Sequence, residues 1–152
     1  MTMWLDAILA YLHFTAIFVF FSFLVVETMM MRSTLDAAAV RVLGRVDIWY
    51  FGAGVAVLVT GFSRLVWGAK GADFYLSAWP VYVKVLLFLV VGALSVAPTL
   101  RFIRWRRLFE RDPAWRVPDE ERRLVRRLIM IEVHIAAVIP FFAVIMSRGL
   151  GY

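Results

Sequence analysis

Apolar residues run along this chain in four long blocks separated by short polar stretches. The blocks cover residues 4–31, 47–68, 79–103 and 124–147. Each is at least as long as the roughly 20 apolar residues that a helix needs to cross a bilayer. A soluble protein would have to bury such helices on all sides, and 152 residues cannot supply that much cover. The pattern therefore predicts an all-α integral membrane protein, a single transmembrane domain over residues 1–152 that forms a four-helix up-down bundle.

Polar residues between the blocks predict where the helices begin. Asp47 would open the second helix, where a carboxylate interacts favourably with the helix dipole. Pro80 fits the first turn of the third helix. Acidic residues 119–121 follow Pro118 and predict a fourth helix that begins before its apolar block and covers about 29 residues. The first block lacks the basic leader and the cleavage site of a signal peptide, so we expect it to remain as the first span.

Basic residues are concentrated in two of the three loops. Of the 17 lysines and arginines, ten lie between Arg101 and Arg127, and the first loop adds three more. The second loop has only Lys70. Because basic loops stay in the cytoplasm, we expect the first and third loops inside and both termini on the non-cytoplasmic side of a bacterial cytoplasmic membrane. The arginine-rich loop would then face lipid headgroups of the bilayer, and no nucleic acid is expected as a partner.

Candidate chemistry is confined to ionisable side chains within the apolar blocks, which are costly in hydrocarbon and usually functional. They are His13, Glu27, Arg64, Lys84, Glu132 and His134. Depth along the helices places His13, Arg64 and Lys84 together in the outer half, as a candidate basic site. His134 lies about 200° around its helix from Glu132, so we expect it to face lipid or a partner protein.

The carboxylates form a separate inner layer in this prediction. Glu27 and Glu132 lie towards the cytoplasm, and Asp47 joins them from the helix boundary. Arg45 and Arg127 are available to neutralise them, which favours an ion-pair network. The same three carboxylates could instead relay protons or a solute across the membrane.

Two stripes with a seven-residue period mark the faces of the first two helices. The first stripe is Asp6, His13, Phe20 and Glu27, and the second is Asp47, Gly54, Gly61 and Gly68. Glycines on one face let another backbone or a flat ligand approach closely. A neutral imidazole is a good axial ligand for haem iron, and a lysine amine can be the opposite ligand once it has lost its proton. An arginine close by could pair with haem propionates.

These residues leave three interpretations open. The first is a haem b-binding redox protein, with His13 and Lys84 as ligands of the iron and Arg64 as an electrostatic neighbour. The second is a non-enzymatic accessory subunit, in a homo-oligomer or a larger membrane complex. The third is a proton or solute conduit that uses the inner carboxylates.

The segment 45–105 contains RVDIWYFGAG, VTGFSRLVWGAKGADFYL and VYVKVLLFLVVGALSVAPTLRFIRW. These motifs resemble a family of small bacterial four-helix membrane proteins that is described only as a domain of unknown function. The positions that carry the resemblance are Asp47, Gly61, Arg64, Lys70, Gly71, Tyr75, Lys84, Ser95, Pro98 and Trp105.

The layout is more distantly similar to HemJ-type protoporphyrinogen oxidases. That resemblance implies a bound b-type haem, with a histidine of the first helix and a lysine early in the third as its ligands. His13 and Lys84 match these positions, and Glu132 is a weaker match. The chain departs from that family at VVETMMMR, at the end of the first block. The resemblance implies removal of hydrogens from protoporphyrinogen. Our leading hypothesis for this chain is the broader one of electron transfer or oxidation of a porphyrin-like or quinone-like substrate that enters from the bilayer.

Overall fold

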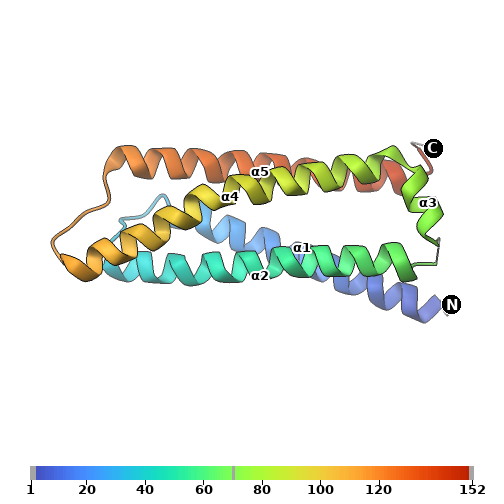
Figure 1. Ribbon diagram of the computed structural model, residues 1–152, viewed down its shortest axis with the longest axis horizontal. Helices are drawn as coiled ribbons and strands as arrows, with labels where there is room; N and C mark the ends of the chain where they lie inside the picture. The colour runs from blue at the N-terminus through green and yellow to red at the C-terminus, as the bar shows by residue number, and fades with distance from the viewer. Residues whose placement is uncertain (1–2, 70, 151–152) are drawn as a thin grey trace.

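Four long antiparallel helices form the molecule (Figure 1). The structure is a computed structural model that describes residues 3–69 and 71–150, so Lys70 lies outside the described residues. The helices are α1 (Met3–Met30), α2 (Ala37–Trp67), α4 (Trp79–Arg111) and α5 (Asp119–Ser147), with a short α3 (Gly71–Ser77) between α2 and α4. Each long helix is long and apolar enough to cross a membrane, and the described residues contain no strand. The predicted all-α, four-helix up-down bundle is confirmed.

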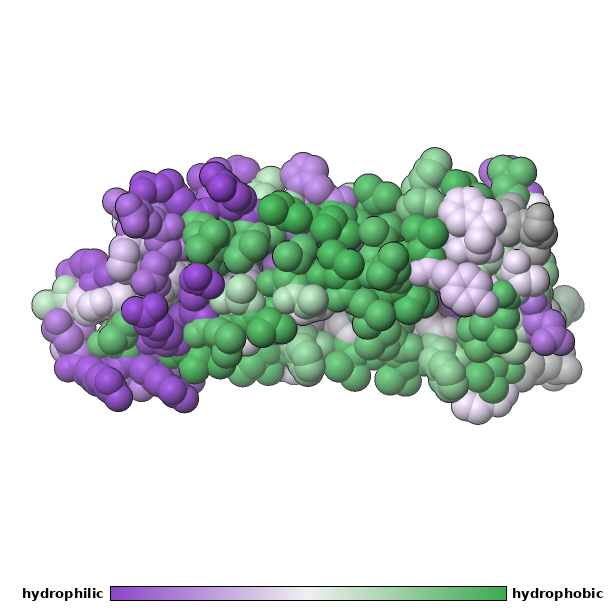
Figure 2. Space-filling view, turned by 45° about the horizontal axis from the view of Figure 1, so that its top comes forward, coloured by the Kyte–Doolittle hydropathy of each residue, from purple (hydrophilic) through white to green (hydrophobic). Residues whose placement is uncertain are grey.

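The two ends of the bundle differ in chemistry. Helix α1 begins and α5 ends at the same end, which α3 covers, and we call it the α3 end (Figure 1). The α1–α2 and α4–α5 loops lie at the opposite end, here called the basic end. Hydrophilic residues gather at that end, and a broad apolar surface covers the middle of the face that Figure 2 shows. An apolar belt of this kind is what lipid tails require of a membrane-spanning surface.

Two of the helices extend further than their apolar blocks. Helix α2 begins at Ala37, ten residues before Asp47, and Asp36 caps it by accepting a hydrogen bond from the Ala39 N–H at 2.7 Å. The prediction that Asp47 opens this helix is therefore wrong, because residues 37–46 already form helical turns whose apolar side chains Val40 and Leu43 are fully buried in the core. Helix α4 likewise continues to Arg111. The predicted 29-residue fourth helix from Asp119 is confirmed.

The hydrophobic core fills the half of the bundle next to the basic end. Its largest buried side chains, all under 2% exposed, are Trp105, Phe102, Leu24, Met31, Leu43 and Ile129. In the half next to the α3 end, the buried residues of the long helices are few, among them Ala16 and Pro80. The bundle is thus firmly packed at one end only, and the polar side chains of the other half lie among partly buried neighbours.

The seven-residue stripes of α1 and α2 meet each other in register. Gly61 lies against the His13 ring, and Gly54 lies against the Phe20 ring. At the α3 end, Asp6 Oδ1 accepts a hydrogen bond from the Ala69 N–H, next to Gly68, at 3.1 Å. At the other end of the stripes, Glu27 lies close enough to Asp47 for their charges to interact. The glycines that we expected to admit a backbone or a flat ligand therefore accommodate aromatic rings of α1.

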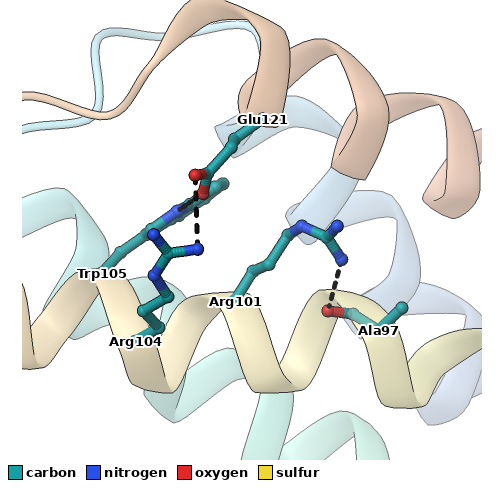
Figure 3. A network of polar contacts seen from close by, with 5 residues as sticks. All are labelled: Ala97, Arg101, Arg104, Trp105 and Glu121. Atoms are coloured by element: carbon teal, nitrogen blue, oxygen red, sulfur yellow. Dashed lines mark hydrogen bonds and ion pairs between the residues drawn. The ribbon is translucent and has the colours of Figure 1, made fainter.

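A hydrogen bond between α4 and α5 closes the basic end (Figure 3). The Trp105 indole is fully buried, and its Nε1–H donates to Glu121 Oε2 at 2.8 Å. The other oxygen of Glu121 lies 3.4 Å from Arg104 Nη1. Because a buried N–H without an acceptor is costly, Glu121 holds the first turn of α5 against α4.

Replacement of Glu121 by alanine should destabilise the protein by about 1–3 kcal/mol, since it leaves the buried indole N–H unpaired. The measurement is the free energy of unfolding in detergent micelles. Glu110→Ala is the matched control: it removes a carboxylate from an exposed pair with Arg106 on the same helix and should cost less than about 0.5 kcal/mol. Equal losses in both variants would contradict a role for the Trp105–Glu121 bond.

Candidate functional site

The imidazole of His13 is held by a hydroxyl of the neighbouring helix. His13 Nδ1 lies 2.9 Å from Thr60 Oγ1 on α2. Thr60 Oγ1 is itself 2.6 Å from the Ala56 carbonyl oxygen, to which it donates its only hydrogen. Thr60 can therefore only accept from His13, which puts the proton of a neutral imidazole on Nδ1. The Nε2 atom keeps its lone pair free for a ligand or a metal.

Gly61 makes room for this arrangement. A Cβ atom at this position would lie 3.2 Å from Cε1 of His13, closer than ordinary van der Waals contact. Thr60 and Gly61 thus act as a pair, in which one residue orients the ring and the other lets its Cε1 atom approach α2 closely. The ring is only partly buried, so one side of the imidazole remains accessible from the less densely packed half of the bundle.

Arg64 and Lys84 lie near His13, as the helical depths predicted. Both are close enough for their charges to act on the imidazole, and Arg64 also acts on Lys84. The Arg64 guanidinium lies over the Phe14 ring at 5.8 Å, and its Nε is buried without a hydrogen-bond partner. Lys84 Nζ has a sulfur neighbour, Met146 Sδ of α5, at 3.7 Å, and thioether sulfur is a weak acceptor.

No ion pair among the described residues includes any of these three basic side chains. Asp6, two turns from His13 on the same stripe of α1, accepts a hydrogen bond from the backbone at Ala69. The arrangement is a small group of partly buried cations with one unpaired N–H and one free imidazole nitrogen. Its chemistry suits an anionic ligand that also presents a metal ion or a proton donor to His13.

An apolar cleft of about 280 Å³ lies nearby between α2 and α4. Phe20 and Phe88 line it, and they lie two turns from His13 and one turn from Lys84 along their helices. Gly54 and Gly92 also line the cleft, and because they have no side chain they leave it wider. Exposed residues such as Phe51 form its rim, so the cleft opens towards the surface that lipid would cover.

Three carboxylates meet in the core of the other half. Glu27, Asp47 and Glu132 are 2%, 7% and 1% exposed, and they come from α1, α2 and α5. Asp47 Oδ1 accepts from the Thr99 hydroxyl at 2.8 Å, and Glu132 Oε2 accepts from the Tyr50 hydroxyl at 3.1 Å. One oxygen each of Glu27 and Glu132 is buried without a partner. We call these three residues, together with Tyr50, the carboxyl cluster.

The expected ion-pair network is not present at the carboxyl cluster. Arg45 and Arg127 are both exposed, and no described ion pair reaches Glu27, Asp47 or Glu132. Both arginines lie on the outer surfaces of their helices, because the core-facing positions are taken by apolar residues. Within the part of the chain that the structure describes, no three His, Asp or Glu side chains are arranged to hold a metal ion.

His134 is apart from both groups, as its helical phase predicted. It is exposed, and its Nδ1 lies 2.5 Å from the Met130 carbonyl oxygen of its own helix. Phe141, on the same face, is also exposed. This histidine therefore has a local structural partner and lies on the surface that would contact lipid or another protein.

The hydroxyl partners of both groups were missed in the sequence. The candidates in the sequence were acidic and basic side chains. The hydroxyl-bearing residues Thr60, Tyr50 and Thr99 were therefore not among them. A signal was present: Thr60 directly precedes Gly61 of the glycine stripe, and Tyr50 lies one turn after Asp47. Polar residues at the helical phase of an intramembrane charge are the expected source of its hydrogen bonds.

Comparison with known proteins identifies the family of this chain but does not assign an activity to it. A search of the curated proteins finds no match to the chain, and neither does a search of the solved structures. One family model, described as "Predicted membrane protein (DUF2214)", matches residues 5–151. This match covers nearly the whole chain and agrees with the four apolar helices. The chain therefore belongs to this family of predicted membrane proteins.

Proposed function

We propose that the protein binds haem b through His13 and acts in electron transfer or in oxidation of a porphyrin-like or quinone-like substrate. The observation that carries the proposal is the 2.9 Å contact between His13 Nδ1 and Thr60 Oγ1, a hydroxyl whose own hydrogen is donated to Ala56. Metal-bound histidines almost always donate their second ring N–H in this way, which fixes the tautomer and orients the other nitrogen. His134, whose Nδ1 lies against its own helix, has no comparable position between helices.

The basic neighbours of His13 support the same ligand. Haem b carries two propionates, and the Arg64 guanidinium, which remains charged, lies near His13. The unpaired Arg64 Nε–H is a donor without an acceptor in a buried position, and a propionate oxygen would supply one. Lys84, once its amine has lost its proton, would be the second residue to hold the iron, in place of its weak contact with Met146.

Each residue then has a defined part. His13 binds through Nε2, Thr60 orients it, and Gly61 keeps the ring against α2. The apolar cleft between α2 and α4 gives a lipid-soluble substrate a route from the bilayer towards this region. A bound haem b would supply one-electron redox chemistry, and the protein would set its ligands and surrounding charge.

Protein purified from haem-supplied cells should show the reduced-minus-oxidised absorption bands of a b-type haem, and His13→Ala should lose them. His134→Ala is the matched control and should keep them, because that histidine lies away from the site. Absence of a haem Soret band in the wild type, or an unchanged band in His13→Ala, would contradict the proposal.

A second pair of variants tests whether haem affinity depends on how the His13 ring is oriented, and not only on whether the ring is present. Thr60→Val keeps His13 and removes the acceptor, and loss of such a partner typically weakens metal binding by about 10-fold or more. Ser63→Ala removes a similar hydroxyl from the exposed face of the same helix and should leave haem affinity unchanged.

The carboxyl cluster favours a second candidate function, movement of protons through the half of the bundle next to the basic end. Three carboxylates without a cationic partner cannot all remain charged in a core of this kind, because unpaired buried charges are very costly. We infer that the cluster holds protons, which Tyr50 and Thr99 help to position. The three carboxylates come from three different helices, so together they bridge the bundle.

Glu132→Gln should lower proton flux into liposomes towards the level of protein-free vesicles, since the amide cannot release a proton. The measurement is acidification of an enclosed pH-sensitive dye under an imposed gradient. Glu110→Gln, an exposed residue at the basic end, should have no effect. Equal flux in the wild type and Glu132→Gln would count against a conducting role.

We also propose that the protein lies in a bacterial cytoplasmic membrane with its basic end in the cytoplasm. The exposed arginines of the α1–α2 and α4–α5 loops support this orientation. The chain has no cysteine, so single cysteines can report the side on which each end lies.

A membrane-impermeant maleimide added to spheroplasts should label Ser77→Cys at the α3 end. It should label Ala114→Cys, in the α4–α5 loop, only after permeabilisation. Both positions are exposed in the structure. The reverse pattern of labelling would show that the orientation is inverted.

A further inference from the structure

A cleft lined by four arginines lies at the basic end of the bundle. It has a volume of about 440 Å³ and is formed by Met31, Arg32, Arg122, Arg123 and Arg126. Met31 and Arg32 come from the residues that end α1, and the other three come from the first two turns of α5. Segments far apart in the sequence therefore bring their positive charges to one concave surface.

Carboxylates neutralise only a small part of this charge. Asp119 Oδ1 pairs with Arg122 Nη2 at 3.3 Å. Glu121 is directed to Arg104 and Trp105 on α4, as Figure 3 shows. No described ion pair includes Arg32, Arg123 or Arg126. A cleft with this balance attracts an anion, and guanidinium groups match the oxygens of a phosphate particularly well.

The level of the cleft along the bundle indicates where the anion comes from. On α1, the apolar run ends directly before Arg32, and Met31 is only 1% exposed. On α5, an apolar run begins at Leu128, just after the arginines. The arginines of the cleft thus lie where the apolar runs of α1 and α5 meet the hydrophilic end. Figure 2 shows the border between that end and the apolar surface. In a bilayer, this border is the level of the lipid phosphates.

We propose that this cleft binds the phosphate group of an anionic membrane phospholipid. Arg32 and Arg126 approach the phosphate from α1 and α5, and the acyl chains continue along the apolar surface beside them. The bound lipid joins the end of α1 to the start of α5, two helices that otherwise contact each other less than either contacts its hairpin partner. The site is independent of His13 and of the carboxyl cluster.

The test is native mass spectrometry of the purified protein with added phosphatidylglycerol or phosphatidylcholine. The wild type should retain phosphatidylglycerol in preference to phosphatidylcholine. Arg123→Gln combined with Arg126→Gln should weaken that binding by about 10-fold or more, since each basic side chain near a membrane surface contributes roughly 5-fold. Both side chains are exposed and outside the core, and helical content by circular dichroism checks that the variant is folded.

The matched control is Arg107→Gln combined with Arg111→Gln. It removes the same charge from exposed positions of α4 that do not line the cleft, and it should retain the lipid. Equal loss in both double variants would overturn the proposal, because binding would then depend on net charge alone. Inorganic phosphate distinguishes the source: if it displaces phosphatidylglycerol at equal concentration, the cleft is a site for soluble phosphate and the lipid assignment is wrong.

Discussion

The register between α1 and α2 determines where every candidate group of this protein lies. Glycines with a seven-residue spacing on α2 face His13 and Phe20 of α1, with Asp6 and Glu27 at the two ends of the same stripe. Side chains on one helix thus fill spaces that glycine leaves on the other, as in close packing between membrane helices. A shift of one turn would separate His13 from Thr60 and would move Glu27 away from Asp47.

The same register places an aromatic layer between the basic residues near His13 and the carboxyl cluster. Phe20 stacks on Tyr50 with ring centroids 4.7 Å apart, and it also contacts Phe88 of α4 at 5.6 Å. His13, Arg64 and Lys84 lie on the α3 side of this layer, and the carboxyl cluster lies on the other side. Apolar rings in this position lower the local dielectric and keep water out. The basic residues and the carboxyl cluster therefore remain separate sites, although α1 and α2 carry members of both.

The sequence was sufficient for the fold class because hydrophobic length and charge placement are local properties. It also separated His13 and its basic neighbours from the carboxylates, since depth along a helix follows from the rise per residue. The start of α2 was missed because Arg41 and Arg45 interrupt the apolar pattern before Asp47, although the helix already contributes Val40 and Leu43 to the core there. The prediction of ionic partners for the carboxylates was also wrong. Arg45 and Arg127 are near in sequence, but their direction around the helix is set by packing among all four helices.

The uneven packing of the bundle has a consequence for how the protein opens. Local unfolding requires least free energy where few large side chains are buried, and that is the half next to the α3 end. Amide hydrogens in that half should exchange with solvent through local openings that leave the basic end folded. Helix ends around His13 could then separate enough to admit a large ligand while Trp105 and its neighbours keep the four helices assembled. The half next to the α3 end is thus the part of the bundle that can open locally without global unfolding, while the half next to the basic end stays folded.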